Sequence, residues 1–468
     1  MAAWLAAIDE SLPDNMGFPM TQQNSRRDFL KTSAAIGSAV WVGNSLQAQE
    51  SKSPMEKVAY ACIGVGGKGS SDSADAASHG QIVAICDVDA RTLEKTGGRP
   101  GFEGAARYAD FREMLEQLGD KIDAVTVSTP DHVHAPAAAM AMKMGKACFA
   151  QKPLTHTVWE ARRLADIARE KGVATQMGNQ GTAHPNLRKA AAILKAGLLG
   201  RIQAAHIFTN RPVWPQGGPR SEPMDVPAHL SWDLWLGPAP ERPFAEGYHD
   251  FKWRGWWDFG TGALGDMACH TFNMPFAALN LKDPTSIQAT CTGHNHDSYP
   301  QASKIHFEFN HPSGSGSMPV WWYDGGNLPD ESLLNGYKIK NKSGAIIVCE
   351  DLTLYSWGDY GNDWVLLDKQ GKEAPIPNVE FEQSPGHFRE FHEAITGVRK
   401  QAMSNFPDYA GPLTETILLG NLAVWVAAEG QGKKIEWDAS KLEATNAPEV
   451  AKVVKKDYRG NYGSFLDA

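Results

Sequence analysis

A glycine-rich turn, Gly64-Val65-Gly66-Gly67-Lys68-Gly69, constrains the fold of this 468-residue chain more than any other feature. An apolar run at 58–63 precedes it, and a second apolar run at 82–86 follows a polar, alanine-rich stretch. In a strand–turn–helix–strand unit, such glycines allow a tight turn, admit a pyrophosphate to the backbone N–H groups and let the helix pack on the strand. The pattern therefore predicts a dinucleotide-binding unit. The residues of this turn assigned to cofactor binding are Gly64, Gly66, Gly67, Lys68 and Gly69.

An acidic residue, Asp87, ends the second apolar run 18 residues after Gly69. A carboxylate at this point would accept hydrogen bonds from the adenosine ribose and would repel a 2′-phosphate, so it favours NAD over NADP. Lys68 within the turn and Arg91 just beyond Asp87 leave NADP open.

The overall composition is that of a globular protein, with 42% apolar and 21% charged residues and a net charge of −9. The negative charge and the lack of a basic stripe argue against a nucleic-acid partner. No run approaches the roughly 20 apolar residues of a membrane span, so no stable membrane insertion is expected.

The first 53 residues have the features of a targeting segment. Arg26-Arg27-Asp28-Phe29-Leu30-Lys31 precedes a short, weakly apolar region, and Leu46-Gln47-Ala48 is a plausible cleavage site. This pattern predicts a leader at 1–53 that engages the twin-arginine export machinery. We therefore expect a protein that is exported folded to the periplasm or secreted.

Residues 54–178 alternate between strand-like and helix-like stretches, which predicts an α/β Rossmann domain with a doubly wound parallel sheet. From 179 to 440 the pattern changes to an α+β domain with a large, antiparallel-rich sheet. Helices are expected at 262–279, 388–395 and 413–426. Residues 441–468 are expected to form a polar C-terminal tail on the surface.

Two short motifs follow strands of the predicted parallel sheet, where ligands bind in such folds. In Thr129-Pro130-Asp131-His132-Val133-His134, a metal site at the His-x-His pair is less favoured than contact with cofactor and substrate. In Gln151-Lys152-Pro153, a partly buried lysine could donate to a carbinol oxygen, although a surface lysine is the alternative. The cofactor contacts assigned beyond the glycine turn are Asp87, Thr129, Pro130, Asp131, His134, Gln151, Lys152 and Asn179.

Asp266 and His270 lie four residues apart in the predicted helix and so share one face. A carboxylate that orients an imidazole is suited to acid–base chemistry near neutral pH. A structural hydrogen bond between the two side chains is an equally open alternative.

Tryptophan is concentrated in one loop-rich stretch: six of the 15 tryptophans lie between 214 and 257. Some of these rings could be core, but flat apolar walls flanked by polar groups also suit a carbohydrate. The expected substrate contacts are His184, Arg211, Tyr248, Trp256, Trp257 and Asp258. No metal ligands are assigned.

Taken together, the glycine turn, the Thr129–His134 loop, Gln151-Lys152-Pro153 and the pair Asp266 and His270 resemble the glucose-fructose oxidoreductase / inositol dehydrogenase / rhizopine-catabolism (Gfo/Idh/MocA) family. The resemblance implies that Lys152, Asp266 and His270 are catalytic. The usual Glu-Lys-Pro motif of the family has Gln151 in the first position here. The export signal resembles a secreted branch that includes sugar oxidoreductases with captive cofactors and glycosidases, and the family implies a homo-oligomer.

Three functions remain open from the sequence. The first is a carbohydrate oxidoreductase that passes hydride between a sugar carbinol and a tightly bound NAD (or NADP), since an exported protein meets no free cofactor pool. The second is a redox-neutral, NAD-dependent glycoside hydrolase or lyase that oxidises the sugar transiently. The third is a non-catalytic, cofactor-retaining sugar-binding protein.

Overall fold

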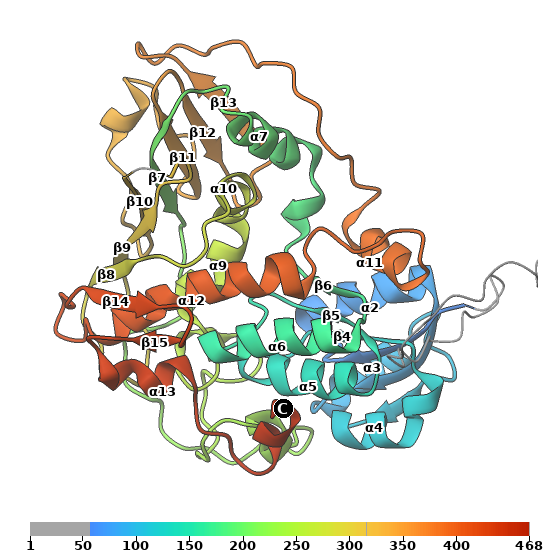
Figure 1. Cartoon of the computed structure of the whole chain (residues 1–468). Coiled ribbons are helices and arrows are strands. Elements are labelled where there is room, and N and C mark those ends of the chain that lie inside the picture. Colours follow the sequence, from blue (N-terminus) through green and yellow to red (C-terminus); the bar gives the residue numbers. More distant parts are fainter. Residues whose placement is uncertain (1–56, 315, 468) are drawn as a thin grey trace, which may run out of the picture. The chain divides into compact units, whose positions relative to one another are not determined.

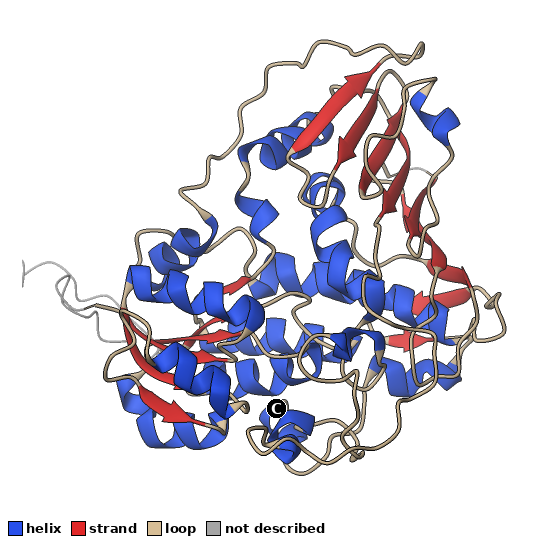
Figure 2. Ribbon diagram, turned by 180° about the vertical axis from the view of Figure 1, so that it is seen from behind, coloured by secondary structure: helices blue, strands red, loops and turns tan. Residues whose placement is uncertain are grey.

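A computed structural model describes residues 57–314 and 316–467; the predicted leader and export signal at 1–53 lie outside them. Six parallel strands form the first sheet in the order β3-β2-β1-β4-β5-β6, which confirms the Rossmann fold (Figures 1 and 2). The strands are β1 (Ala59–Ile63), β2 (Gln81–Cys86), β3 (Ala106–Tyr108), β4 (Ala124–Val127), β5 (Ala147–Ala150) and β6 (Thr175–Met177). The helices are α2 (Gly67–His79), α3 (Ala90–Gly97), α4 (Phe111–Leu118), α5 (Asp131–Lys143) and α6 (Val158–Lys171).

Local sequence explains these boundaries. β4 and β5 are buried at every residue, as expected for central strands covered by helices on both faces. Asp89 and Asp110 accept a backbone N–H at the starts of α3 and α4, and Thr157 forms a capping box with Glu160 at the start of α6.

The second sheet has nine strands in the order β13-β12-β11-β7-β10-β9-β8-β14-β15 and is antiparallel except between β7 and β10. Its strands are β7 (Ile202–Phe208), β8 (Ser286–Cys291), β9 (Ser303–Asn310), β10 (Ser317–Tyr323), β11 (Gly344–Cys349), β12 (Thr353–Trp357), β13 (Asp363–Leu367), β14 (Ile435–Asp438) and β15 (Glu443–Ala444). The helices are α7 (Pro185–Lys195), α8 (Trp232–Leu236), α9 (Gly262–Thr271), α10 (Asn273–Leu279), α11 (His387–Ile395), α12 (Gly411–Trp425) and α13 (Ala451–Val454). The single helix expected at 262–279 is therefore two helices that meet at Phe272.

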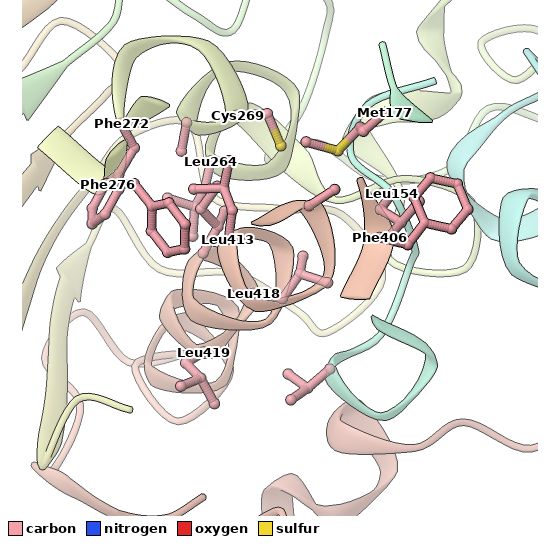
Figure 3. Close-up of a cluster of buried hydrophobic side chains, with 14 of the residues drawn as sticks. Leu154, Met177, Leu264, Cys269, Phe272, Phe276, Phe406, Leu413, Leu418 and Leu419 are labelled. Atoms are coloured by element: carbon pink, nitrogen blue, oxygen red, sulfur yellow. The ribbon is translucent and has the colours of Figure 1, made fainter. Parts of the chain in front are cut away.

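Helix α12 joins the two halves of the described chain. It packs against α6 of the first domain and against α9 and β8 of the second, and it is buried along almost its whole length. Figure 3 shows Leu413 and Leu418 of this helix in a cluster that also holds Leu154 and Met177 from the first domain. Among the described residues, no helix is long and apolar enough to cross a membrane.

The C-terminal segment corrects one expectation, because residues 441–467 are packed rather than draped over the surface as a polar tail. Leu466 is fully buried and its carbonyl oxygen accepts a hydrogen bond from Arg163 Nε (2.7 Å). Lys456 Nζ donates to the carbonyl oxygen of His132 (3.2 Å) and pairs with the buried Glu160 (3.1 Å). These contacts hold the segment against α5 and α6 of the first domain.

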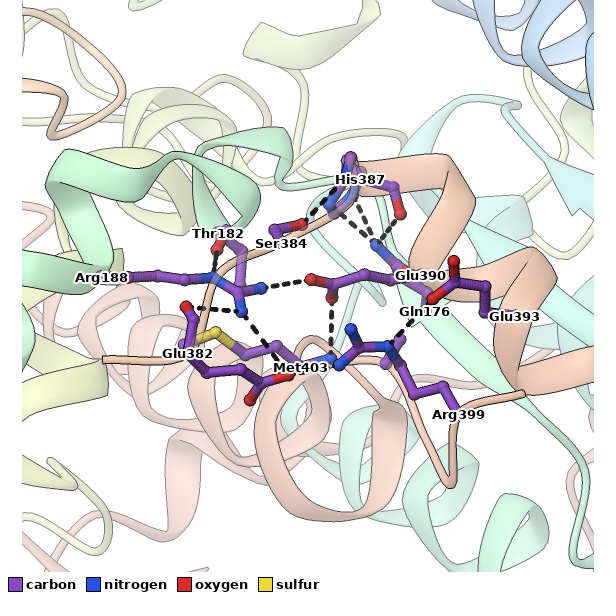
Figure 4. A network of polar contacts seen from close by, with 12 residues as sticks. Gln176, Thr182, Arg188, Glu382, Ser384, His387, Glu390, Glu393, Arg399 and Met403 are labelled. Carbon is purple, nitrogen blue, oxygen red and sulfur yellow. Dashed lines mark hydrogen bonds and ion pairs between the residues drawn. The ribbon is translucent and has the colours of Figure 1, made fainter. Parts of the chain in front are cut away.

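A buried polar network holds the end of β6 and the following turn in place (Figure 4). Arg188 of α7 forms an ion pair with Glu390 of α11, and both side chains are almost completely buried. Arg188 Nε also donates to the carbonyl oxygen of Thr182 (2.8 Å), and Glu390 accepts from the Met403 N–H (3.2 Å). The network therefore connects α7, α11 and the turn that follows β6.

Replacing one partner tests this network. Arg188→Met leaves the Glu390 carboxylate buried without its cation, so we expect the free energy of unfolding to fall by about 3–5 kcal/mol in chemical denaturation. The control is Lys338→Met, which removes an ion pair with Glu331 between exposed side chains and should leave stability unchanged within error. Equal stability of the two variants would contradict a structural role for the buried pair.

Candidate active site

A cavity of about 590 Å³ opens at the carboxyl ends of β1, β2, β4 and β5. This is the place where doubly wound sheets bind ligands. Most of the predicted cofactor residues line it: Gly64, Gly66, Gly67, Lys68, Asp87, Thr129, Pro130, Asp131, His134, Gln151 and Lys152.

The glycine turn has the close backbone approach that a dinucleotide site needs. A Cβ atom on Gly69 would lie 2.0 Å from the Gly64 carbonyl oxygen, so only glycine allows α2 to start this close to β1. Gly69 therefore determines how closely α2 approaches β1, and it does not line the cavity. Asn179 is fully buried and accepts a hydrogen bond from Ser404 Oγ (2.6 Å), so its assignment as a cofactor contact is not supported.

Asp87 shapes the turn as well as the cavity. One carboxylate oxygen accepts from the Val65 N–H (2.9 Å) and the other from the Asp89 N–H (3.0 Å). Burial raises the pKa of Asp87, and these two N–H groups oppose that effect. The carboxylate is thereby fixed at the end of β2, where an adenosine ribose would lie.

Gln151 has a defined structural partner. Its Nε2 donates to the Oδ2 of Asp72, a buried carboxylate that also accepts from Ser128 Oγ; both distances are 2.8 Å. A glutamate at position 151 would place a second carboxylate against Asp72, whereas the amide can donate. The glutamine that stands in place of the family's usual glutamate thus fits the carboxylate of Asp72 on the neighbouring helix α2.

Two later parts of the chain close the cavity on its other side. The loop-rich stretch contributes Leu234, Trp235 and residues 249–251, 253 and 254, and the C-terminal segment contributes Tyr462. The loop is bonded to the end of β2, because Ala90 N–H donates to the His229 carbonyl (2.9 Å) and Ser231 N–H to the Val88 carbonyl (3.0 Å). The Arg112 guanidinium lies 4.7 Å from the centre of the Tyr462 ring.

At the Lys152 end of the cavity, Lys152 meets Asp266 of α9. Lys152 Nζ donates to Oδ1 (2.8 Å) and to the carbonyl oxygen (2.9 Å) of Asp266, and Arg254 Nε donates to Oδ1 (3.2 Å). Burial alone would raise the pKa of Asp266, but the two cations outweigh it and lower the pKa to about 2. Asp266 is therefore ionised. The sequence predicts a hydrogen bond between Asp266 and His270, but Asp266 accepts hydrogen bonds from Lys152 and Arg254 instead.

His270 lies one turn further along α9 and is 4% exposed. Burial lowers the pKa of its imidazole well below the usual value, and nearby Lys152 adds to this effect. Its Nδ1 has no hydrogen-bond partner among the described residues. The site thus combines a neutral imidazole with a fixed ammonium group, which suits proton transfer to and from a hydroxyl group.

The aromatic rings expected to bind substrate are mostly core. Tyr248 and Trp256 pack in a cluster with Phe259 and Trp235, and Trp257 stacks on Tyr299 at 3.8 Å. Their assignment as substrate walls is wrong, because Tyr248 and Trp256 form part of the loop's own core and Trp257 belongs to the main hydrophobic core.

Of the three polar residues assigned to substrate, two have structural partners and one lies at the site. Asp258 forms an ion pair with the buried Arg242, and His184 caps α7 by accepting from Asn186 N–H (3.2 Å). Arg211, in contrast, lies at the site, with its Nε 4.0 Å from Asp266 Oδ2.

The two histidines that suggested a metal alternative are both engaged with the backbone. The ring nitrogens of His134 lie 2.8 Å from the carbonyl oxygens of Pro153 and Thr129. Those of His132 lie 3.2 and 3.0 Å from the carbonyls of Phe259 and Trp235. Within 57–314 and 316–467, no group of three or more potential metal-ligating side chains occurs.

Sequence reasoning missed Arg254, Asp359 and Tyr360. Asp359 Oδ2 lies 3.6 Å from Arg211 Nη2, and the Tyr360 ring meets His270 edge-on at 5.0 Å. Asp359 and Tyr360 belong to the turn between β12 and β13, two strands that the sequence analysis does not predict. No local motif marks them, so only the fold brings them to the site.

Substituting the third glycine of the turn tests the dinucleotide site. Gly69→Ala should weaken binding of a reduced nicotinamide dinucleotide by roughly ten-fold or more, because the added methyl group collides with the Gly64 carbonyl. Fluorescence titration measures the effect. Gly98→Ala is the control, since its Cβ would come no closer than 3.7 Å to any neighbour; equal binding by both variants would argue against this turn as the site.

Comparison with known proteins agrees with this geometry. Residues 58–179 match the model for an oxidoreductase family NAD-binding Rossmann fold, and residues 185–315 match the C-terminal alpha/beta domain of the same family. The chain is 33% identical over 148 residues to a dTDP-3,4-didehydro-2,6-dideoxy-alpha-D-glucose 3-reductase from Actinomadura kijaniata (32% of this chain, 42% of the relative). It is 31% identical over 168 residues to a glycosyl hydrolase family 109 protein from Shewanella pealeana (34% and 37%).

These two alignments span less than half the length of either relative. The fold extends further: an inositol dehydrogenase homolog from Azotobacter vinelandii, solved with NAD+, superposes with a TM-score of 0.56 at 18% identity, covering 82% of this chain and 98% of that one. The two matched domains together make up more than half of the chain. The chain therefore belongs to the Gfo/Idh/MocA oxidoreductase family and carries its NAD-binding Rossmann domain.

Proposed function

We propose that the protein is a carbohydrate oxidoreductase that transfers hydride between a sugar carbinol and a tightly held NAD. One observation carries the proposal: Lys152 lines the same cavity as the dinucleotide-binding turn and forms an ion pair with Asp266, which lies one helical turn from the neutral His270. Several relatives are named for sugars or cyclitols, including levoglucosan dehydrogenase and inositol 2-dehydrogenase. The carboxylate of Asp87 favours NAD over NADP.

The residues divide the chemistry between them. When bound, the nicotinamide supplies the acceptor for a hydride from the sugar carbon. His270 is assigned to accept the hydroxyl proton, because its imidazole is neutral and lies one helical turn from Asp266, the partner of Lys152. Lys152 uses two N–H donors on Asp266, so its third can stabilise the oxygen on which negative charge develops. Asp266 holds the ammonium in place.

The additional walls of the cavity support a cofactor that stays bound between turnovers. Trp235 and residues 249–251, 253 and 254 cover one part of the cavity and Tyr462 another, and both segments are bonded to the first domain. Both segments therefore add contact surface for a bound dinucleotide. Retention fits a protein exported folded by the twin-arginine route to a compartment without free cofactor, which we propose together with a homo-oligomeric state.

The activity can be measured by mixing the protein, as purified with its nucleotide, with a panel of sugars and cyclitols and recording the absorbance of reduced nicotinamide. His270→Ala and Lys152→Ala should each lower kcat by about 100-fold or more. Lys146→Ala, before β5 at the opposite end of the strand, is the control and should keep full activity. Wild-type rates in both site variants would overturn the assignment.

Measurements of aglycone release and of sugar binding on the same preparation distinguish the alternatives. Release of aglycone from glycosides with no net change in nicotinamide absorbance would indicate the redox-neutral hydrolase or lyase. Sugar binding without either reaction would indicate a non-catalytic, cofactor-retaining binding protein.

Cofactor retention gives a separate prediction. Tyr462→Ala removes a ring from the cavity wall, so we expect bound nucleotide to dissociate about ten-fold faster or more in a dilution or dialysis assay. Phe465→Ala is the matched control, because this ring lies on the same segment but does not line the cavity. Equal retention by wild type and both variants would show that the C-terminal segment does not hold the nucleotide.

A further inference from the structure

The turn between β12 and β13, residues 358–362, reaches the catalytic histidine from the second sheet. The centre of the Tyr360 ring lies 5.0 Å from that of His270, with the planes at 80°. Tyr360 is 38% exposed, whereas His270 is 4% exposed. The turn therefore presents an accessible aromatic ring directly beside a buried proton acceptor.

This turn is fixed in position. The Asn362 carbonyl accepts from Asn186 Nδ2 (2.9 Å), and Gly358 N–H donates to the Ser343 carbonyl (2.8 Å). A Cβ on Gly181 would lie 2.8 Å from the Tyr360 carbonyl oxygen, so the turn after β6 approaches Tyr360 as closely as glycine allows. Through the Thr182 carbonyl, the buried Arg188 holds that turn. The ring thus stands on a rigid support.

Polar groups connect the catalytic lysine with the same turn. Lys152 pairs with Asp266, Arg211 Nε lies 4.0 Å from the other oxygen of Asp266, and Arg211 Nη2 lies 3.6 Å from Asp359. The side chains of Arg211 and Asp359 are 23% and 26% exposed, so both remain open to a ligand. Planar guanidinium and carboxylate groups next to an exposed ring are suited to hydroxyl groups on a ring with an apolar C–H face.

We propose that Tyr360 is the stacking platform for the substrate ring, and that Arg211 and Asp359 bind its hydroxyl groups. The inference rests on the proposed function and narrows its substrate to a hydroxylated ring with an apolar C–H face. A ring stacked on Tyr360 lies next to His270, so one of its hydroxyls can meet the imidazole and Lys152. The platform is this tyrosine rather than Trp256 and Trp257 of the loop-rich stretch, which are buried in hydrophobic clusters.

Steady-state kinetics of the nucleotide-loaded protein test this assignment with the sugar that wild type oxidises. Tyr360→Ala should raise KM about ten-fold with a smaller change in kcat, because stacking holds the ring while His270 and Lys152 carry out the chemistry. Tyr360→Phe keeps the ring and should stay within about two-fold of wild type. Tyr337→Ala, which removes a tyrosine on another loop, is the control.

A second variant keeps the test independent of the tyrosine. Asp359→Asn retains shape but loses the charge, so it should also raise KM with bound nucleotide unchanged. If wild type oxidises a sugar while Tyr360→Ala and Asp359→Asn keep its KM, the platform is overturned and the proposed function stands. If wild type neither oxidises nor binds any sugar or cyclitol, both are overturned.

Discussion

The ion pair between Lys152 and Asp266 is the interaction on which the site depends. The lysine follows β5 of the Rossmann domain and the carboxylate lies on α9 of the second domain, so the pair crosses the boundary between them. A buried charge is stable only when it is paired and hydrogen bonded, and Asp266 meets this condition with Lys152 and Arg254. Electrostatics therefore requires the two domains to meet at this point.

The surrounding structure keeps that meeting point rigid. Helix α12 packs against both domains, and the pair Arg188 and Glu390 holds the turn after β6. The loop-rich stretch has an aromatic core of its own around Phe259, and this core lets a segment with little regular structure cover a nucleotide cavity. The packing of aromatic rings, rather than hydrogen bonding between strands, thus holds the loop-rich stretch in its conformation.

The sequence allows good prediction where the chemistry is local. The glycine turn, Asp87, the Thr129–His134 loop and Lys152 each follow a strand of one sheet, and the parallel topology brings them to one edge. The sequence predicts poorly which side chains meet when they lie far apart along the chain. The spacing of Asp266 and His270 suggested a hydrogen bond between them, but a lysine more than 100 positions earlier along the chain takes that carboxylate.

The same reasoning explains the aromatic residues. A tryptophan-rich loop has the same composition whether its rings face a ligand or one another, and here Tyr248, Trp256 and Trp257 face one another or the core. Asp359 and Tyr360 carry no signal because the turn that presents them lies between two strands whose pattern is short. The packed C-terminal segment was hidden by its polar composition, since its few buried residues, such as Leu466, are widely spaced.

The position of Tyr462 in the cavity wall has a consequence for biosynthesis. Residues 455–467 leave the ribosome after every other segment that lines the cavity, while the Rossmann domain can fold as soon as it emerges. The wall that Tyr462 provides is therefore missing until residues 455–467 have been translated and dock on α5 and α6. The nucleotide can thus enter a folded Rossmann domain before Tyr462 completes the wall beside it.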